Sequence, residues 1–227
     1  MLLYPRLTQL DLTGPFEVFA MLRDARVHLL WKTREPVESA TGMSILPTLT
    51  LEECPALDVL FVPGGPGQVE LMDDEVVLDF LARQGAQARY VTSVCTGSLV
   101  LAAAGLLRGY RAACHWMARD DLALLGAIPA AERVVLDRNR ITGAGVTAGI
   151  DFALTLATLL RGETQAKAIQ LALEYDPAPP FEAGSPERAG PELVAALLRH
   201  RGRLSVARRA ATLRAQARLE SRNRRGP

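Results

Sequence analysis

The sequence predicts an α/β fold with a mostly parallel sheet that helices cover on both faces. Residues 57–62 and the run before Cys95 are continuously apolar, as strands inside a parallel sheet are. Stretches with helical patterning follow both runs, and this alternation favours parallel strands joined by crossover helices. With 227 residues, the chain is long enough for one large domain of this class.

Glycine and proline divide the first half of the chain into short elements. The pair Gly14-Pro15 places proline at the first position of a helix, where its missing N–H has no cost. The predicted elements are, in order, a short strand at 2–4, a loop through Asp11, a helix over 14–22, a strand at 26–32, short strands within 38–50, the strand 57–62 and a helix over 69–86.

The second half begins with the strand that leads to Cys95. Residues 133–142 alternate apolar and polar side chains around Asp137-Arg138-Asn139, which predicts a hairpin. The other predicted elements are helices over 96–107, 144–160 and 163–175, a loop at 177–186 and a last helix from Pro191. We expect residues 1–200 to form the α/β domain and residues 201–227 a basic C-terminal helix or tail.

Charge is distributed unevenly along the chain. The formal net charge is +1, yet the segment from Arg199 onward has ten arginines and one glutamate, which leaves −8 on the remainder. No helix-turn-helix, zinc spacing or aromatic pattern accompanies these arginines, so we expect no specific nucleic-acid binding. The tail also contains apolar residues, which indicate a helix that docks on the acidic body or on a partner subunit: Leu204, Val206, Leu213 and Leu219. We expect the tail to be dispensable for turnover.

Cysteine usage and hydropathy indicate a cytoplasmic protein. Cys54, Cys95 and Cys114 are an odd number with no metal-binding spacing, which argues against a disulfide framework and against zinc. The chain has no apolar run of about 18 residues, so no membrane span is expected. A charged residue at Arg6 argues against a signal peptide.

Cys95 is the residue most indicative of function. It lies between a predicted strand and a predicted helix, and the small residues Ser93 and Gly97 flank it as a nucleophile elbow requires. The helix N-terminus favours a thiolate, so we expect the pKa of Cys95 to be below the ordinary value of about 8.5. The alternative is a buried structural cysteine, the commonest role of a free thiol.

Other candidates occur where ligands of a parallel sheet gather, after the carboxyl ends of strands. They are Asp11 and the glycine loop with Gly64 and Gly65. Asp11 has an alternative role in orienting its turn, and the glycines are also turn formers. His115 is the only histidine with a plausible route to the thiol, although a structural role beside Trp116 is equally open.

The substrate pocket has weaker candidates. Tyr175, at the end of the predicted helix 163–175, and Phe181, in the predicted loop 177–186, are our candidates for pocket-lining residues.

Four motifs stand out along the chain: DLTGP at 11–15, VPGGPG at 62–67, YVTSVCTGSLVLAAAGLL at 90–107 and TAGIDFALTLA at 147–157. Together they resemble the ThiJ/PfpI superfamily, most closely its isonitrile hydratase (isocyanide hydratase) branch. The resemblance implies a flavodoxin-like three-layer sandwich, usually a homodimer. It also implies hydration of a small-molecule isonitrile to an N-substituted formamide, without metal or organic cofactor.

The resemblance also implies roles for individual residues. Cys95 matches the family nucleophile, and Asp11 occupies the position where many relatives have glutamate and the hydratase branch has aspartate. Thr96 replaces the histidine of protease-like members, which removes the base that peptide hydrolysis needs. We expect Cys95 and Asp11 to act through a thioimidate, and the backbone amides of Gly64, Gly65 and Thr96 to stabilise developing negative charge.

Two other functions stay open from the sequence. One is a different cysteine enzyme of this fold, glyoxalase-like or amidase-like, which a contact between His115 and the sulfur would favour. The other is a ligand-sensing or redox-sensing regulator domain. No added helix-turn-helix segment is evident after residue 200, which argues against the regulator.

Overall fold

The computed structural model describes residues 1–224, and its centre is a four-stranded sheet. The strand order is β5 (Val59–Val62), β6 (Tyr90–Val94), β10 (Arg140–Gly143) and β9 (Val134–Asp137). The first three strands are parallel, and β9 is antiparallel to β10. The predicted α/β class and the hairpin around residues 137–139 are thus confirmed.

The N-terminal residues extend this sheet on the side of β5. Leu2 donates its N–H to the carbonyl of Phe61 (2.9 Å) and forms a single parallel bridge with Leu30. Beyond it, β1 (Leu30–Trp31) pairs in parallel with β4 (Leu49–Thr50). The strand expected over 26–32 is therefore only two residues long. The amino group of Met1 binds the His28 carbonyl (2.7 Å), which takes the place of a strand partner there.

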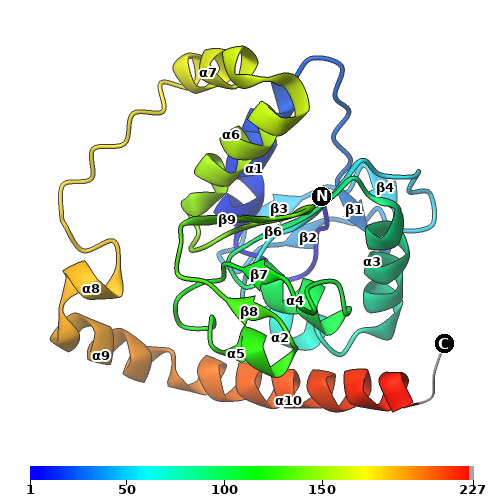
Figure 1. Ribbon diagram of the computed structural model, residues 1–227, viewed down its shortest axis with the longest axis vertical. Helices are drawn as coiled ribbons and strands as arrows, with labels where there is room; N and C mark the ends of the chain where they lie inside the picture. Colours follow the sequence, from blue (N-terminus) through cyan, green and yellow to red (C-terminus); the bar gives the residue numbers. More distant parts are fainter. Residues whose placement is uncertain (225–227) are drawn as a thin grey trace.

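Helices α1 (Gln9–Ala20) and α6 (Ala148–Arg161) pack together on one face of the sheet (Figure 1). Three aromatic rings join this layer to β5: Phe19, Phe61 and Phe152 have centroids 5.6 to 6.4 Å apart. Helix α7 (Glu163–Ala172) packs on α6.

The start of α1 differs from the prediction of a loop through Asp11. The Asp11 N–H binds the carbonyl of Thr8 (3.0 Å), which starts the helix before Pro15, and Pro15 lies inside it. Asp11 therefore belongs to the first turn of a helix, which fixes its side chain more firmly than a loop does.

The opposite face of the sheet is covered by shorter helices: α2 (Gln68–Leu71), α3 (Glu75–Gln87), α4 (Gly97–Ala103) and α5 (Asp121–Leu124). The single helix expected over 69–86 is divided into α2 and α3. Asp74 causes this division because its side chain accepts the N–H of Val77 (3.3 Å) and caps a new helix. Two short strand pairs complete the body: β2 (Val37–Glu38) with β3 (Ser44–Ile45), and β7 (Arg111–Ala112) with β8 (Ile128–Pro129).

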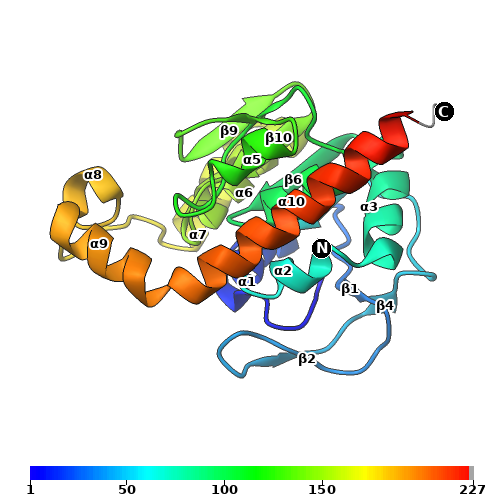
Figure 2. The ribbon, with the colours of Figure 1, turned by 90° about the horizontal axis from the view of Figure 1, so that it is seen from below.

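The C-terminal part of the chain forms α8 (Pro186–Ala189), α9 (Pro191–His200) and α10 (Gly202–Arg224). Figure 2 shows α10 crossing beneath the body, as the docked helix was expected to do. Its contact residues agree with the prediction only in part. Leu219 packs against the hydrophobic core as predicted, and Ala211 and Ala215 belong to that core, whereas Val206 is 72% exposed and Leu213 is 49% exposed.

The expectation that the tail is dispensable therefore needs correction, because α10 contributes to the core of the domain. Arginines of α10 also bind acids of the body, as the opposite charges of tail and body led us to expect. Arg214 and Arg218 bind Asp73, and Arg208 binds Asp121. Within residues 1–224, no helix is both long and apolar enough to cross a membrane.

Candidate active site

Cys95 lies in the turn between the end of β6 and the start of α4. Its φ of +58° is unusual for a residue other than glycine. Its N–H donates to the carbonyls of Gly143 (3.1 Å), the last residue of the neighbouring strand β10, and Ala144 (2.8 Å), which follows it. The turn is therefore fixed from both sides, and the side chain of Cys95 is buried.

Asp11 reaches this turn from the first turn of α1. Its carboxylate is fully buried, and Oδ2 accepts the N–H of Gly64 (2.9 Å). Oδ1 is buried without a conventional hydrogen-bond partner among the described residues, and the thiol of Cys95 is the side-chain donor beside the carboxylate. A negative charge that is this poorly compensated in a buried site has a strong tendency to take up a proton.

Gly64 is where the candidate groups converge. A Cβ at this position would lie 2.6 Å from the Thr96 nitrogen, 2.7 Å from Asp11 Oδ2 and 2.8 Å from Cys95 Cβ. Only glycine fits between them, so the loop predicted from PGGPG is required for the close approach of α1 and β6.

Burial determines the protonation of the pair. It raises the pKa of Asp11 to about 7, although the Gly64 N–H and the Cys95 thiol oppose the shift. Burial also raises the pKa of Cys95 well above its ordinary value, and the negative charges of Asp11 and Cys114 add to the shift. The expectation of a low pKa for Cys95 is therefore wrong. The Thr96 N–H at the helix start lowers this pKa, but burial outweighs it.

The amides expected to stabilise negative charge have partners inside the site. The Gly64 N–H binds Asp11, and the Gly65 N–H donates to Thr96 Oγ1 (3.0 Å). The Thr96 hydroxyl is thus directed to Gly65, while the Thr96 N–H faces the sulfur of Cys95. In this conformation, the Thr96 amide is the donor next to the reacting atom.

His115 lies behind the site rather than in it. Its ring stacks on Trp116 with centroids 5.9 Å apart, and Nδ1 accepts the N–H of Met117 (3.3 Å). Burial lowers the pKa of His115 to about 4, and the charges of Arg208 and Arg201 contribute. Among the described residues, no hydrogen bond joins His115 to Cys95.

The two candidate pocket residues lie in different surroundings. The Tyr175 hydroxyl donates to Asp151 Oδ2 (3.2 Å) on the first turns of α6, and Arg133 Nε binds the same oxygen (2.6 Å). Phe181 is 78% exposed, so it lines no pocket of a single chain. The pocket-lining role stays a prediction.

The sequence did not reveal two buried polar residues near the site. Arg208 of α10 has a side chain only 8% exposed, and it binds Asp121 (3.1 Å) and the Met117 carbonyl behind Cys114. Gln68, directly after the glycine loop, is buried with Oε1 unpartnered among the described residues. Nothing in the sequence distinguishes Arg208 from the other arginines around it. For Gln68, the available signal was its position directly after PGGPG.

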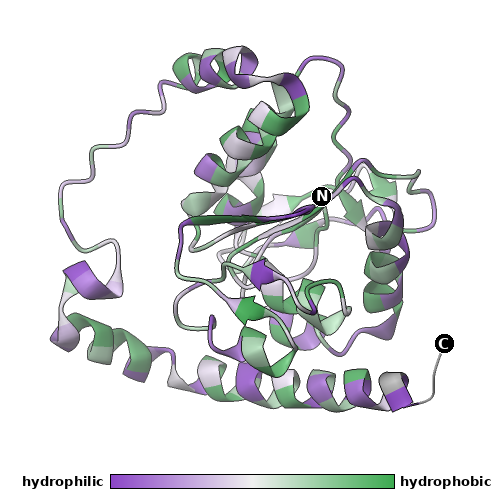
Figure 3. Ribbon diagram, in the orientation of Figure 1, coloured by the Kyte–Doolittle hydropathy of each residue, from purple (hydrophilic) through white to green (hydrophobic). Residues whose placement is uncertain are grey.

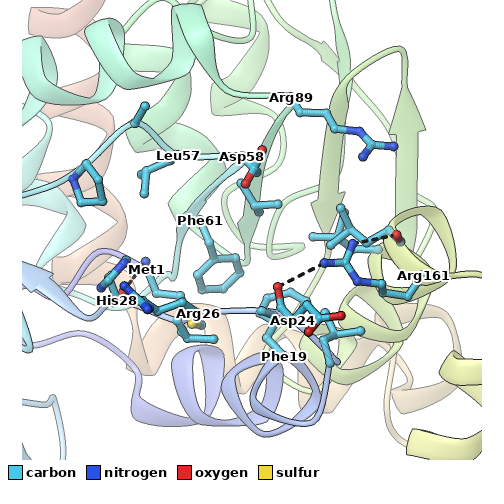
Figure 4. A pocket seen from close by; sticks show the side chains of 18 residues that line it. Met1, Phe19, Asp24, Arg26, His28, Leu57, Asp58, Phe61, Arg89 and Arg161 are labelled. Carbon is cyan, nitrogen blue, oxygen red and sulfur yellow. Dashed lines mark hydrogen bonds between the residues drawn. The ribbon is translucent and has the colours of Figure 1, made fainter.

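A separate cavity of about 500 Å³ lies at the other ends of the strands (Figure 4). Asp58 before β5 and Arg89 before β6 line it together with Met1 and Arg161, whereas Cys95 follows the carboxyl end of β6. None of the candidate site residues lines this cavity.

Comparison with known proteins assigns relatives to the chain. The DJ-1/PfpI family model matches residues 1–159. An isonitrile hydratase of Pseudomonas putida is 60% identical over 193 residues, which are 85% of each chain. A crystal structure of a ThiJ/PfpI family protein from Pseudomonas syringae superposes with a TM-score of 0.91 at 48% identity and covers 93% of this chain and 88% of that one. The transcriptional regulator GbdR of Pseudomonas aeruginosa is 35% identical over 153 residues, 66% of this chain but only 41% of the regulator.

Proposed function

The chain belongs to the DJ-1/PfpI family, and we propose that it acts there as an isonitrile hydratase, which adds water to an isonitrile to give an N-substituted formamide. The extended similarity to the Pseudomonas putida hydratase supports this activity. The observation that carries the mechanism is the buried pair of Cys95 and Asp11, in which a thiol faces a carboxylate with an unpartnered oxygen.

The first half of the reaction uses Cys95 as nucleophile and Asp11 as proton carrier. The terminal carbon of an isonitrile accepts a nucleophile and a proton at the same atom. Asp11, with a pKa of about 7, takes the thiol proton as the sulfur attacks and then transfers it to that carbon. The product is a thioimidate on Cys95 and an ionised Asp11.

The second half uses the same carboxylate as a base. Asp11 removes a proton from water, whose oxygen attacks the thioimidate carbon, and the nitrogen takes up the proton. The carbon–sulfur bond then breaks, the formamide leaves, and the hydroxyl proton returns to Cys95. The sum is isonitrile plus water to formamide, with both side chains regenerated.

Thr96 and the glycine loop act by holding this pair. The Thr96 N–H beside the sulfur stabilises negative charge as it develops. The Gly64 N–H keeps Asp11 oriented, and it becomes a donor to the substrate only if Asp11 moves. The turn at Cys95 serves as the nucleophile elbow in this proposal.

An amidase-like or glyoxalase-like reaction through a Cys–His pair is less well supported. Such a pair requires a hydrogen bond between nucleophile and base, and His115 instead stacks on Trp116 and binds the backbone of Met117.

We further propose a homodimer that works in the cytoplasm. The free cysteines Cys54, Cys95 and Cys114 suit a reducing compartment. Unburied apolar residues on the C-terminal helices suit a subunit interface.

The direct test is incubation with one aromatic and one alkyl isonitrile, with formamide measured by chromatography. We expect formamide from at least one substrate, with no added metal or cofactor. Absence of formamide from both, with a folded protein, would contradict the assignment.

A further inference from the structure

The cavity at the amino ends of β5 and β6 has no part in the proposed hydratase chemistry. Its volume of about 500 Å³ lies within the range of small-molecule sites. Figure 4 shows side chains from the segment between α1 and β1, from β5 and from α6 around it. Because these parts belong to the sheet and its covering helices, the cavity has the fixed frame that a ligand site requires.

Part of the cavity wall is apolar. Phe19 and Phe61 line it and pack against Phe152, which holds their rings in place. Figure 3 shows hydrophobic and hydrophilic residues interspersed along residues 21–29, which form another part of the wall. Further apolar lining residues come from this segment, from the chain before β5 and from α6: Leu22, Leu57, Leu156 and Leu160. Such a wall can take up the apolar body of a ligand.

Two arginines at the cavity have guanidinium groups without an acidic partner. Arg161, at the end of α6, donates to the carbonyls of Arg23 (3.0 Å) and Asp24 (3.3 Å). These carbonyls hold the guanidinium in place but leave its positive charge uncompensated. Arg89 lies beside the Tyr90 ring, with its guanidinium carbon 5.2 Å from the ring centroid. Neither arginine takes part in a salt bridge within residues 1–224, and Figure 4 shows both at the same side of the cavity.

The cavity has more positive than negative charge. Arg26 is a third arginine in its wall, whereas its acids are Asp24 and Asp58, which are both exposed. Burial lowers the pKa of the Met1 amino group to about 5 and the pKa of His28 below its ordinary value, so both groups are neutral near neutral pH. A single net positive charge remains, which favours a ligand with one negative charge.

We propose that this cavity binds a small organic acid, whose carboxylate accepts hydrogen bonds from Arg89 and Arg161. The apolar body of the acid packs against Phe19 and Leu57. This site is separate from the candidate active site at the opposite ends of the strands, and it does not depend on the hydratase activity.

A carboxylate suits the cavity better than other charged groups. A guanidinium presents its N–H donors in a planar fork that matches the two oxygens of a carboxylate. A phosphate is more strongly hydrated, and the loss of that hydration against an apolar wall is costly. A cation is repelled by the arginines. The apolar wall and the pair of arginines together therefore select an acid with one carboxylate and an apolar body.

Three probes test the site. 4-Phenylbutyrate has both the carboxylate and the apolar body, 4-phenylbutanamide lacks the charge, and butyrate lacks the ring. Isothermal titration calorimetry measures the Kd of each probe for the wild type, for Arg89→Gln, for Arg161→Gln and for the control Arg83→Gln. Arg83 is exposed on α3 and does not line the cavity. Circular dichroism checks the folding of each variant.

We expect 4-phenylbutyrate to bind the wild type and the control with a Kd of about 0.1–1 mM. The amide and butyrate should bind the wild type about tenfold more weakly, and each cavity variant should bind 4-phenylbutyrate about tenfold more weakly. Arg89→Gln is the decisive variant, because the Arg89 guanidinium makes no hydrogen bond within residues 1–224 and its loss should leave the fold intact.

Three results would overturn the proposal: equal Kd values for the acid and the amide, an unchanged Kd in Arg89→Gln, or no binding of 4-phenylbutyrate to the folded wild type. Each of these is measured without an isonitrile. Formamide production by a protein that does not bind the acid would overturn the cavity site and leave the hydratase intact.

Discussion

At the carboxyl ends of β5 and β6 the chain packs so closely that Gly64 has no room for a side chain, whereas at the amino ends of the same strands it leaves a cavity of about 500 Å³. The cavity has the greater volume, and burial lowers the pKa of the Met1 amino group on its wall to about 5, but no cysteine lines it among the described residues. Arg161 donates to the carbonyls of Arg23 and Asp24, and the amino group of Met1 binds His28.

The closed end contains the buried group that lacks full compensation. Asp11 Oδ1 has no conventional partner among the described residues, and the pKa of the carboxyl group is about 7 as a result of burial. The comparison teaches that the candidate site is marked by an uncompensated buried charge beside a thiol, and not by the size of an opening.

Replacing the proposed nucleophile should show the largest difference in activity between the carboxyl ends and the amino ends of β5 and β6. Cys95→Ala should abolish formamide production, because no other thiol lies beside Asp11. Cys54→Ala, near the amino ends of the strands, is the matched control and should keep wild-type turnover. Measurable formamide production by folded Cys95→Ala would contradict catalysis through this sulfur.

Replacing the acid should cost about 10²- to 10⁴-fold in kcat/KM, since Asp11→Asn removes the proton carrier. In the wild type, the carboxylate must be ionised to accept the thiol proton. The rate should therefore rise with pH, level off above the Asp11 pKa of about 7, and fall about tenfold per pH unit below it. Rates of formamide formation between pH 5 and 9 test this profile. The control variant Asp58→Asn, at the rim of the cavity, should keep the wild-type pH profile. An unchanged profile in Asp11→Asn would mean that another group causes the fall in rate at low pH.

Ion pairs on α10 offer a second contrast, between a buried and an exposed arginine. Arg208→Met leaves the buried Asp121 with only the half-exposed Arg209 as a salt-bridge partner, so it should lower the free energy of unfolding by at most about 3–5 kcal/mol. Arg222→Met breaks an exposed pair with Asp79 and should cost at most about 1 kcal/mol. Urea denaturation measures both, and equal effects would mean that the burial of Arg208 carries no stability.

The carboxylate of Asp11 should also reduce the stability of the folded protein as pH rises. The folded-state pKa of Asp11, about 7, exceeds its ordinary value of 3.8, so its contribution is complete below pH 4 and is lost as pH rises through 7. Asp11→Asn should therefore be more stable than the wild type at pH 8, by an upper bound of roughly 4 kcal/mol. Denaturation of both proteins at pH 4 and pH 8 checks the sign; a variant less stable at pH 8 would contradict the shift.

The smallest effect is expected for His115. His115→Ala removes the ring stacked on Trp116 and should lower kcat/KM at most about tenfold, through packing and not through proton transfer. Its pKa of about 4 leaves it neutral over the working pH range, so the pH profile should stay that of the wild type. A loss as large as that of Cys95→Ala would favour the amidase-like reaction.

Local patterns predicted the sheet, the hairpin and the turn at Cys95, because each depends on a few adjacent residues. The pKa of Cys95 was not predictable in the same way, because burial and the negative charges of Asp11 and Cys114 come from parts of the chain distant in sequence and together exceed the effect of one helix N-terminus. The docking face of α10 was predicted only in part, through Leu219. Leucine spacing indicated one face, but small alanines allow a closer approach to the body, and Arg208 finds a buried partner that only the tertiary structure supplies.

The left-handed backbone of Cys95 has a consequence for engineering. At φ +58°, a residue with a Cβ has a conformational free energy about 1 kcal/mol less favourable than that of glycine. Glycine at position 95 would relax the chain and delete the sulfur in one step. Selection for thermal stability would therefore favour glycine at position 95, whereas the proposed catalysis requires cysteine. A library screened for melting temperature alone would tend to select a more stable but inactive protein.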